Sequence, residues 1–376
     1  MNKRSNSRSL LLVGGGADRI NVRYACGFDA PDPFLYVEAK GQKHLLVSML
    51  ELGRAQQLGE AVQTHTHDSL GLKPKERRSL GQQALGLLKH LGLKRIQVSA
   101  DCPIGVVREL EKAEIKVRVA KAPLYPERLV KTDKEIEFLR ASQRAAVSAM
   151  KAAIGMIEAS DISAEGHLLQ QNGEVLTAEI VRHQIERVLL DADCIAEDII
   201  VACGDQAVDP HERGYGPLYA HQFIVLDIFP CSKTSGYWGD ITRTVLRGGA
   251  DPMQTKLYKT VLKAQKEALA SVKPGANAKE IHQRIFDRFV AAGFVTGMKD
   301  GVPQGFIHST GHGVGLEIHE GPSVSPAGTE LEVGQVITIE PGLYYRGLGG
   351  VRIEDTVVVT EKGCSALARC SKEWRL

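Results

Sequence analysis

The 376-residue sequence lacks several features that define common classes of protein. Its formal net charge is only +2, so it offers no concentrated basic face for a dedicated nucleic-acid surface. Its seven cysteines are odd in number and form no CxxC pair, which favours reduced thiols over a disulfide framework. No apolar run is long enough to span a membrane. We therefore expect neither a nucleic-acid partner nor a membrane partner.

We expect no export signal in the N-terminal segment. Met1–Arg8 is basic, but only Leu10–Val13 follows as an apolar run, which is shorter than the core of a signal peptide. The triplet Gly14–Gly16 lacks the GxGxxG spacing of a dinucleotide-binding loop. We therefore expect a cytoplasmic protein, and we do not interpret the triplet as a dinucleotide-binding loop.

The length and the residue pattern predict two domains. Residues 1–125 alternate short apolar strands with helical patterns, which is typical of a small α/β domain. The strands are expected near 10–13, 34–37, 44–47, 96–99 and 115–119, and the helices near 48–57, 78–91 and 104–113. Two prolines, Pro123 and Pro126, mark a linker.

Residues 130–376 predict helices that alternate with antiparallel hairpins, as in an α+β domain. The first helix begins with a capping box formed by Thr132 and Glu135. The others are expected at about 178–192, from Asp251-Pro252 to the residue before Pro274, and from Asn277 to Gly293. A curved sheet would then lie on one side of the domain, with the helices covering its back.

The segment HSTGHGVGLEIHE, residues 308–320, concentrates His308, His312 and His319 in a few turns of chain. Imidazole is a common metal ligand, and it exchanges a proton near pH 7. The glycines at alternate positions around His312 have no side chain, so they predict a close approach of the backbone to a metal or a substrate.

Two aspartates flank a loop in VLDIFPCSKTSGYWGDITRT, residues 225–244. Side-chain alternation predicts one strand through Asp227 and a second, opened by Gly236, through Asp240. The intervening PCSKTSG is typical of a hairpin loop. Both aspartates would then turn to one side and bind the same ions, whereas two solvated aspartates beside a turn are the alternative.

A second pair of carboxylates lies in VITIEPGLYY (336–345) and GGVRIEDTVVVT (349–360). Glu340 and Glu354 fall in apolar strands, where burying a carboxylate is costly unless it is paired or bound to a metal. An ion pair of Arg352 with either glutamate is the structural alternative. It would leave the aspartates and the glycine-flanked histidine unexplained.

These carboxylates and His312 predict a site for two divalent cations. Two such ions would neutralise the four carboxylates, and the imidazole is neutral as a ligand. The donor set is rich in oxygen and suits Mn, Co, Fe or Zn better than a thiolate site would. Paired metals commonly share a bridging hydroxide and stabilise a hydrolytic transition state. The set therefore predicts a hydrolytic enzyme. Its members are Asp227, Asp240, His312, Glu340 and Glu354.

The same five residues, within GYWGDITRT, GHGVG, ITIEPG and VRIED, resemble in order the metal ligands of the pita-bread metallopeptidases, peptidase family M24. That family includes Xaa-Pro aminopeptidases, Xaa-Pro dipeptidases (prolidases) and methionine aminopeptidases. The resemblance covers residues 130–376 and implies an α+β pita-bread catalytic domain there. Residues 1–125 resemble more weakly the α/β N-terminal domain of the proline-specific branch, which is creatinase-like.

The resemblance implies a role for each ligand. Asp227 would chelate one metal ion, His312 and Glu340 would bind the other, and Asp240 and Glu354 would bridge both. Glu340 would also take a proton from the bridging water and pass it to the leaving amine.

The resemblance also assigns four residues outside the ligand set. His319 matches a histidine that stabilises the tetrahedral intermediate, and His308 matches a pocket histidine of the proline-specific members. His211, in CGDQAVDPHERG, matches a histidine that contacts the substrate backbone, although an exposed loop position is the alternative. Arg352 resembles the arginine that orients a bridging aspartate.

The remaining histidines that we considered carry no such match. His65 and His67 form an HxH pair in a threonine-rich loop without a further ligand nearby, and we interpret them as surface residues. His221 precedes the strand of Asp227 and is expected in a loop.

The sequence departs from the family pattern in the spacing of its two aspartates. Asp227 and Asp240 are two residues further apart than is usual in the family. An even insertion keeps both side chains on one face, and it costs only roughly a few tenths of a kcal/mol in loop closure. We therefore expect the metal site to persist, with a changed loop at its rim, residues 230–235.

The second departure concerns the substrate. Many prolidases carry a motif resembling SPRG where this sequence has SVSPAGTELE, residues 323–332, and the arginine of that motif holds the carboxylate of the dipeptide. Here the matching residue is Ala327, and no arginine lies between His319 and Glu340. This favours longer peptides.

We therefore predict a dinuclear exopeptidase of the Xaa-Pro aminopeptidase type. It would remove the N-terminal residue of a peptide, preferably when proline follows, by attack of a metal-bridging hydroxide. The resemblance favours manganese ions and a homodimer, and the alternative activity is that of an Xaa-Pro dipeptidase.

Other members of the fold fit the sequence less well. Simple methionine aminopeptidases lack the N-terminal domain, and creatinase-like amidinohydrolases lack the metal ligands. A catalytically silent pita-bread binding protein is the alternative from a different class. Such proteins characteristically lose ligands, whereas this sequence keeps all five.

Overall fold

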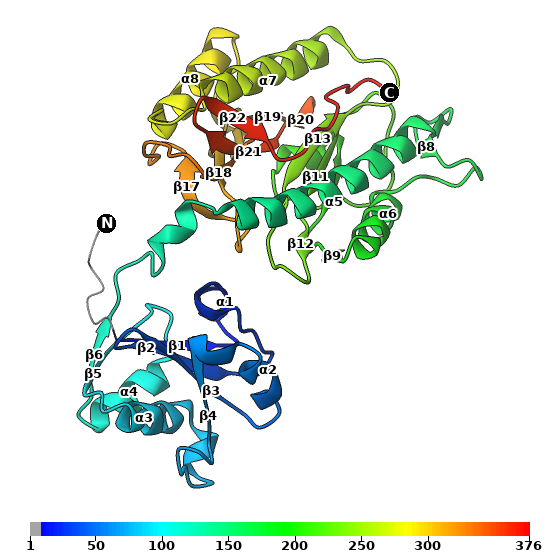
Figure 1. The fold of residues 1–376 in the computed structure, drawn as a ribbon. Coiled ribbons are helices and arrows are strands. Elements are labelled where there is room, and N and C mark those ends of the chain that lie inside the picture. The colour runs from blue at the N-terminus through cyan, green and yellow to red at the C-terminus, as the bar shows by residue number, and fades with distance from the viewer. Residues whose placement is uncertain (1–8) are drawn as a thin grey trace. The chain divides into compact units, whose positions relative to one another are not determined.

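The computed structural model describes residues 9–376, so the basic stretch Met1–Arg8 lies outside the described residues. The chain divides into two compact units, Met1–Pro126 and Glu127–Leu376 (Figure 1). Residues 127–129, which the prediction left outside both domains, belong to the second unit. They lie in the 3-10 turn η3 (Pro126–Leu129).

The first unit is a six-stranded sheet with helices on both faces. Its strands lie in the order β4–β3–β2–β1–β5–β6. They are β1 (Leu10–Gly14), β2 (Phe34–Ala39), β3 (Gln42–Val47), β4 (Val62–Thr66), β5 (Arg95–Val98) and β6 (Lys116–Val119). Strand β2 runs antiparallel to β1 and β3, whereas β3–β4, β1–β5 and β5–β6 are parallel pairs. Helices α3 (Leu80–His90) and α4 (Ile104–Lys112) share a core with one face. Helices α1 (Arg19–Cys26) and α2 (Leu52–Gln56) share a core with the other face, as predicted for an α/β domain.

The residue pattern did not predict helix α1 or strand β4 of this unit. Helix α1 buries only Val22, so it has no apolar stripe to reveal it. Strand β4 lies at the edge of the sheet and is largely polar. The prediction that His65 lies in a surface loop is therefore wrong. His65 lies in β4, half-buried, with its Nε2 3.2 Å from Nδ1 of His44 and its ring against that of His90.

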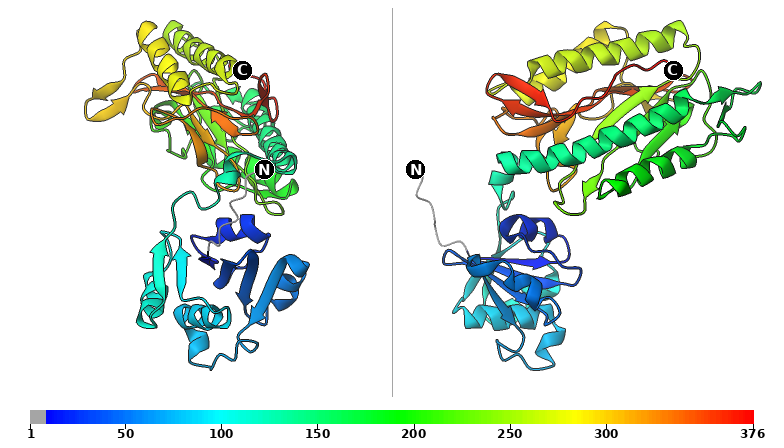
Figure 2. Two further views of the ribbon diagram at one scale, coloured as in Figure 1. Left: turned by 60° about the vertical axis from the view of Figure 1, so that its left-hand side comes forward. Right: turned by 45° about the vertical axis from the view of Figure 1, so that its right-hand side comes forward.

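The second unit contains two pairs of helices, each packed on its own strands (Figures 1 and 2). The first pair, α5 (Asp133–Glu158) and α6 (Ala178–Asp191), shares a core with a three-stranded sheet. Its strands lie in the order β10 (Ile200–Cys203), β11 (Ile224–Ile228) and β13 (Ile241–Val245), all antiparallel.

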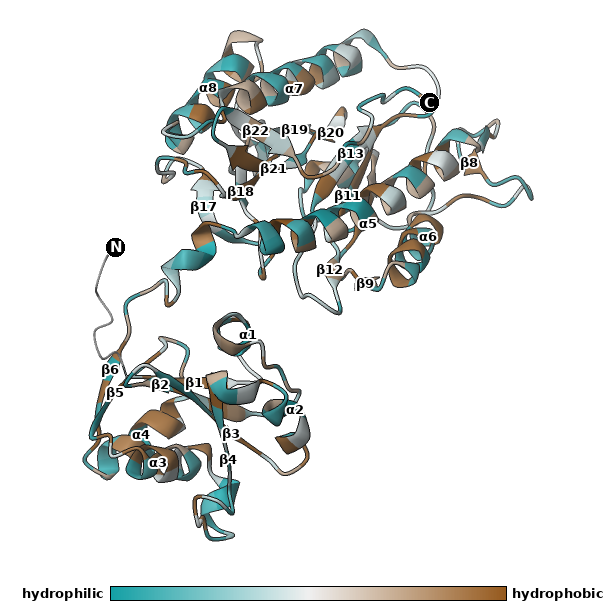
Figure 3. Cartoon of the chain, viewed as in Figure 1, coloured by the Kyte–Doolittle hydropathy of each residue, from teal (hydrophilic) through white to brown (hydrophobic). Residues whose placement is uncertain are grey.

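The second pair, α7 (Pro252–Ser271) and α8 (Ala278–Ala291), covers the later strands. Five of these form the sheet β17–β16–β18–β21–β22, and two form the ribbon β19–β20. Their bounds are β16 (Gly311–Gly313), β17 (Glu320–Val324), β18 (Val336–Ile339), β19 (Gly342–Tyr345), β20 (Gly349–Arg352), β21 (Asp355–Thr360) and β22 (Gly363–Ala366). In Figure 3 the helices carry both teal and brown segments, whereas β21 is largely brown, as expected for a buried strand.

Short elements complete both units. The 3-10 turns are η1 (Gly59–Ala61), η2 (Glu76–Arg78) and η4 (Gly204–Val208). The short strands are β7 (Asp161–Ile162), β8 (Leu168–Leu169), β9 (Cys194–Ile195), β12 (Cys231–Ser232), β14 (Gly297–Lys299) and β15 (Val302–Gln304).

Helix starts in the second unit follow the predicted caps. The side chain of Thr132 accepts a hydrogen bond from the backbone N–H of Glu135, and the Glu135 side chain closes the capping box. Asp251 and Gln254 form the same arrangement at α7, with Pro252 in the first turn. Asn277 caps α8. These caps satisfy N–H groups that have no partner within the helix.

The structure also bears on membrane-spanning helices and on disulfide bonds. Among residues 9–376, no helix combines the length and the apolarity that crossing a bilayer requires. All seven cysteines are free thiols.

The capping box of α5 yields a stability prediction. Thr132→Ala removes the hydroxyl that caps this helix, and the free energy of unfolding of the second unit should fall by about 1 kcal/mol. Both tryptophans, Trp238 and Trp374, lie in this unit, so urea unfolding followed by fluorescence reports on it. The control, Thr260→Ala, lies inside α7 and should change stability by less than about 0.5 kcal/mol. Equal effects of the two substitutions would contradict the prediction.

Candidate metal centre

A cavity of about 980 Å³ in the second unit is lined by all five predicted metal ligands. The other four predicted site residues, His211, His308, His319 and Arg352, line the same cavity. The fold therefore brings together predicted site residues that lie up to 143 positions apart in the sequence, from His211 to Glu354.

The five predicted ligands project from strands or from the residues next to them. Asp227 lies in β11 and His312 at the centre of β16. Glu340 follows β18 directly, and Glu354 lies between β20 and β21. Strands fix the direction of each side chain, so the donor atoms are held in place before any ligand binds.

Asp240 is held differently from the prediction. The second strand of the hairpin begins at Ile241 and not at Gly236, so Asp240 immediately precedes it. The amide of Gln143, in α5, takes the place of a strand partner: its Nε2 donates to the carbonyl oxygen of Asp240 (2.7 Å), and its Oε1 accepts from the N–H of Asp240 (2.8 Å). The residue is fixed in spite of its loop position.

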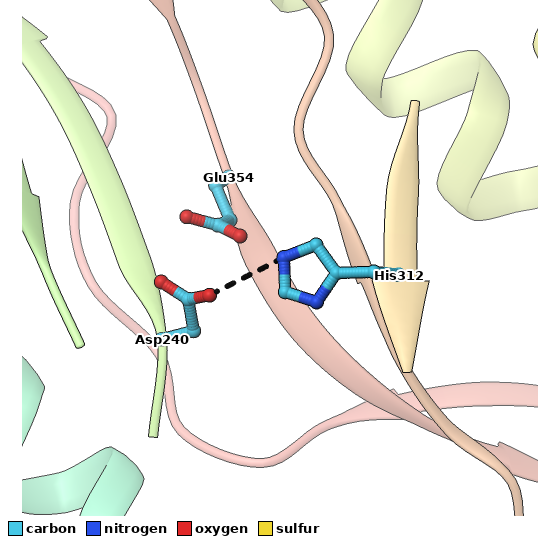
Figure 4. Close-up of side chains that lie close together, drawn as sticks. All are labelled: Asp240, His312 and Glu354. Atoms are coloured by element: carbon cyan, nitrogen blue, oxygen red, sulfur yellow. Dashed lines mark ion pairs between the residues drawn. The ribbon is translucent and has the colours of Figure 1, made fainter. Parts of the chain in front are cut away.

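Asp240, His312 and Glu354 point toward one another (Figure 4). Each offers a ligand atom, and these atoms all lie within 4.8 Å of one another. The His312 Nε2 lies 3.5 Å from Asp240 Oδ2 and 3.4 Å from Glu340 Oε1. The His312 Nδ1 faces the carbonyl oxygen of Gly313 at 3.2 Å. Because a carbonyl only accepts, Nδ1 carries the proton and Nε2 keeps its lone pair for a metal.

Asp227 is oriented by a chain of hydrogen bonds that the sequence did not reveal. Arg352 Nη2 donates to Asp227 Oδ2 at 2.6 Å, and Arg352 Nη1 donates to the Tyr344 hydroxyl at 2.8 Å. That hydroxyl lies 2.9 Å from His308 Nε2, while His308 Nδ1 faces the carbonyl oxygen of Ser309 at 2.7 Å. The His308 Nδ1 must therefore donate, and its Nε2 accepts from Tyr344.

This chain corrects the predicted partner of Arg352. The sequence suggested an arginine that orients a bridging aspartate, which would be Asp240, but Arg352 binds Asp227. It also forms no ion pair with Glu340 or Glu354 among the described residues, which rules out the simple ion-pair alternative there. Tyr344 was missed because a tyrosine in GLYY has no distinctive pattern.

The donors fit divalent cations, as one buried atom shows in particular. The Oδ1 atom of Asp227 is buried and accepts no hydrogen bond from any residue between 9 and 376. Leaving a buried carboxylate oxygen without a partner is costly, and a cation would remove that cost. Together with the clustered oxygens of Asp240 and Glu354 and the free Nε2 of His312, this atom is suited to a hard divalent ion.

The electrostatics of the cavity point the same way. Burial, followed by repulsion from neighbouring carboxylates, raises the pKa values of Asp240 and Glu354 well above their ordinary range. Burial raises the pKa of Glu340 to about 8. Burial lowers the pKa of His312 to about 4 and that of His308 to about 3, so both imidazoles are neutral at pH 7. Without cations, Asp240, Glu340 and Glu354 would hold protons instead.

The glycines around His312 serve packing between strands. A Cβ at Gly311 would lie 2.0 Å from the carbonyl oxygen of Thr338, and a Cβ at Gly313 would lie 2.1 Å from that of Gly321. The predicted close approach is therefore to the neighbouring strands rather than to a metal or a substrate. Any side chain would push β16, and His312 with it, away from the other ligands.

His319 and His211 lie on the exposed side of the cavity. The His319 ring meets the His312 ring edge to face, with centroids 4.3 Å apart. The next residue, Glu320, is bound by Lys131 Nζ at 2.8 Å and Arg128 Nη2 at 2.6 Å, which anchors the loop after His312. His211 is exposed, so the structure leaves its loop alternative open.

Two other histidines, which we interpreted as surface or loop residues, are not among the described residues that line the cavity. His221 occupies a turn with φ of 63°, and its Nδ1 lies 3.0 Å from the backbone of Gly249. His67 is only partly exposed and follows β4 in the first unit.

Comparisons with known proteins agree with this geometry. The family model described as Metallopeptidase family M24 matches residues 137–361. A curated Xaa-Pro dipeptidase from Pyrococcus horikoshii is 34% identical over 298 residues, 75% of each protein.

Two solved structures resemble the chain over nearly its whole length. The prolidase from Pyrococcus horikoshii OT3 has a TM-score of 0.79 at 28% identity, with 98% of this chain and 95% of the other covered. The Xaa-Pro dipeptidase from Bacillus anthracis has a TM-score of 0.82 at 25% identity, with the same coverage.

The raised pKa of Glu340 predicts how stability depends on pH after metal removal. Glu340 has an ordinary pKa of 4.5 and a pKa of about 8 in the folded chain. Between these values the folded state keeps a proton that the unfolded state has released, so the free energy of unfolding falls as pH rises.

We therefore expect the thermal midpoint of the chelated protein to fall across that window and to recover on addition of Mn²⁺. Thermal scans over the pH range measure this, and Glu340→Gln should make the slope of the chelated protein shallower, while Asp240 and Glu354 keep part of it. Glu330→Gln, an exposed glutamate nearby, should leave the slope unchanged. A flat profile in the chelated parent protein would refute the prediction.

The hydrogen-bond chain behind Asp227 yields a second prediction. Tyr344→Phe removes the hydroxyl that joins Arg352 to His308, so the arginine holds Asp227 less firmly. Metal affinity should fall about tenfold or more, as is typical when a partner of a metal ligand is lost. Titration of the chelated protein with Mn²⁺ measures this. Tyr345→Phe is the matched control, because its hydroxyl bonds only to the carbonyl oxygen of Val295 in the described chain, and it should bind Mn²⁺ as the parent does.

Proposed function

This chain belongs to metallopeptidase family M24, whose pita-bread fold it shares, and we propose that it is an Xaa-Pro dipeptidase. The observation that carries the proposal is the single cavity lined by Asp227, Asp240, His312, Glu340 and Glu354. The names of the relatives favour cleavage of Xaa-Pro dipeptides over the aminopeptidase activity that the sequence first suggested.

The five ligands would hold two divalent cations, and manganese remains our prediction for their identity. Asp227 would bind one ion, His312 and Glu340 the other, and Asp240 and Glu354 both. When bound, such cations polarise a carbonyl oxygen and lower the pKa of water toward neutrality. A homodimer also remains a prediction.

Glu340 would move the proton in this reaction. As water attacks the scissile carbonyl carbon, the Glu340 carboxylate accepts a proton from the water and then delivers it to the leaving nitrogen of proline. Cations held at the site would keep Glu340 ionised at neutral pH, so its carboxylate could accept the proton from water before passing it on. His319 would donate a hydrogen bond to the oxyanion, and His211 would contact the substrate backbone.

His308 supports the preference for proline. Its pKa of about 3 keeps the ring neutral, and its neighbour Ile307 lines the same cavity. The proline ring is apolar and its nitrogen, once in a peptide bond, has no N–H to donate. A neutral wall of this kind suits such a group better than a charged one would.

A second candidate activity is that of an Xaa-Pro aminopeptidase acting on longer peptides. One observation favours it: Ala327 stands where many prolidases have an arginine, and Ala327 is exposed and does not line the cavity among the described residues. Unless another cation binds the substrate carboxylate, a dipeptide would gain nothing over a longer chain.

Hydrolysis of Gly-Pro and Gly-Pro-Pro by protein reloaded with Mn²⁺ tests the proposal. We expect Gly-Pro to be cleaved with the higher kcat/KM. Glu340→Gln should lower kcat by at least about 100-fold, because it removes the group that moves the proton. The control Glu330→Gln should keep full activity. Cleavage of Gly-Pro-Pro alone would establish the aminopeptidase, and cleavage of neither peptide would reject both candidates.

A further inference from the structure

We propose that Arg213 binds the free carboxylate of the substrate and so selects dipeptides. This inference rests on the proposed function, because only a dipeptide places a carboxylate directly after proline. Arg213 belongs to the segment CGDQAVDPHERG, two residues after His211, and it lines the cavity of the metal centre.

A substrate carboxylate needs a positively charged partner in order to bind in this cavity. Acidic side chains dominate the lining, and they would repel a substrate carboxylate. Among the described residues that line the cavity, Arg213 and Arg352 are the two arginines, and no lysine is present. The acidic residues are Asp198, Asp227, Asp240, Glu320, Glu340 and Glu354.

Arg352 already binds other side chains of the protein. Its guanidinium donates to Asp227, to Tyr344 and to Thr242, at 2.6, 2.8 and 3.3 Å. Its side chain is 4% exposed, so a substrate could reach it only by breaking these bonds. The cation that remains for a substrate is Arg213.

Arg213 has a fixed backbone and a loosely held side chain. Its carbonyl oxygen accepts from the N–H of Val201 at 2.9 Å and from Arg182 Nη1 at 2.7 Å. The side chain is 50% exposed, and its ion pair is with Asp198, at 3.4 Å, which is itself 73% exposed. Exposed pairs of this kind contribute only about 0–1 kcal/mol, so a substrate carboxylate can displace Asp198.

The position suits the length of a dipeptide. Asp227 in β11 faces Ile200 in β10, and the next residue, Val201, holds Arg213 on the far side of β10. The backbone of Arg213 is thus two strand spacings, roughly 10 Å, from that of Asp227. One extended residue of substrate spans about 3.5 Å beyond the scissile bond, and the long arginine side chain covers the remainder. A guanidinium fork also matches a carboxylate with two parallel hydrogen bonds.

Paired substrates test the inference. Gly-Pro and Gly-Pro-amide differ only in the charge of the terminal group, so their ratio of kcat/KM reports recognition of the carboxylate. The Mn²⁺-loaded parent should prefer Gly-Pro. Arg213→Met should raise KM for Gly-Pro about tenfold or more and change the amide less than about twofold. Arg213→Lys should retain part of the preference, and Arg284→Met, an exposed arginine on α8, should retain all of it.

A binding measurement separates recognition from catalysis. Calorimetric titration of Gly-Pro into Glu340→Gln, with the bound Mn²⁺ first counted in each variant and equal between them, should show weaker binding, by about tenfold, when Arg213→Met is added.

The outcomes distinguish the inference from the proposed function. If the parent cleaves neither substrate, the proposed function fails, and the inference fails with it. If the parent prefers Gly-Pro and Arg213→Met keeps that preference, only the inference is overturned. It is also overturned if Arg213→Met impairs both substrates equally, or if the parent cleaves the amide as well as the acid.

Discussion

Repulsion among four buried or partly buried carboxylates is the constraint on which the rest of the catalytic unit depends. Burial and mutual repulsion raise the pKa values of Asp240 and Glu354, and burial raises that of Glu340. Within residues 9–376, the one arginine or lysine that forms an ion pair with any of the four is Arg352, and it pairs with Asp227. The three other carboxylates need protons or added cations, which makes a metal centre the economical explanation of the site.

The fold supplies the rigidity that keeps these groups together. Thr242 Oγ1 donates to Glu354 at 2.8 Å, and the buried Arg243 donates to the carbonyl oxygen of the same glutamate. Gln143 holds the backbone of Asp240 from helix α5. Because each ligand is tied through its backbone or a neighbouring hydroxyl, like charges cannot relax apart, and the free energy of that repulsion becomes available for binding cations.

The sequence predicted which residues line the cavity better than it predicted the contacts around them. Ligand chemistry demands particular residue types, so Asp227 and His312 could be recognised from local motifs, and helix starts such as Thr132 carry their own caps. Contacts between distant strands leave no local pattern, which is why the partner of Arg352, 125 residues away, and the role of Tyr344 emerged only from the structure. The roles of the glycines, the start of β13 and the polar edge strand β4 escaped prediction for the same reason: each depends on what a neighbouring strand places beside it.

Calorimetric titration of the chelated protein with Mn²⁺ tests the central claim most directly. Run at neutral pH in two buffers with different ionisation enthalpies, it gives both the number of ions bound per chain and the number of protons released. The account predicts two ions and a net release of protons, because raised pKa values keep protons on the carboxylates until cations replace them. Absence of binding, or binding of a single ion without proton release, would contradict it.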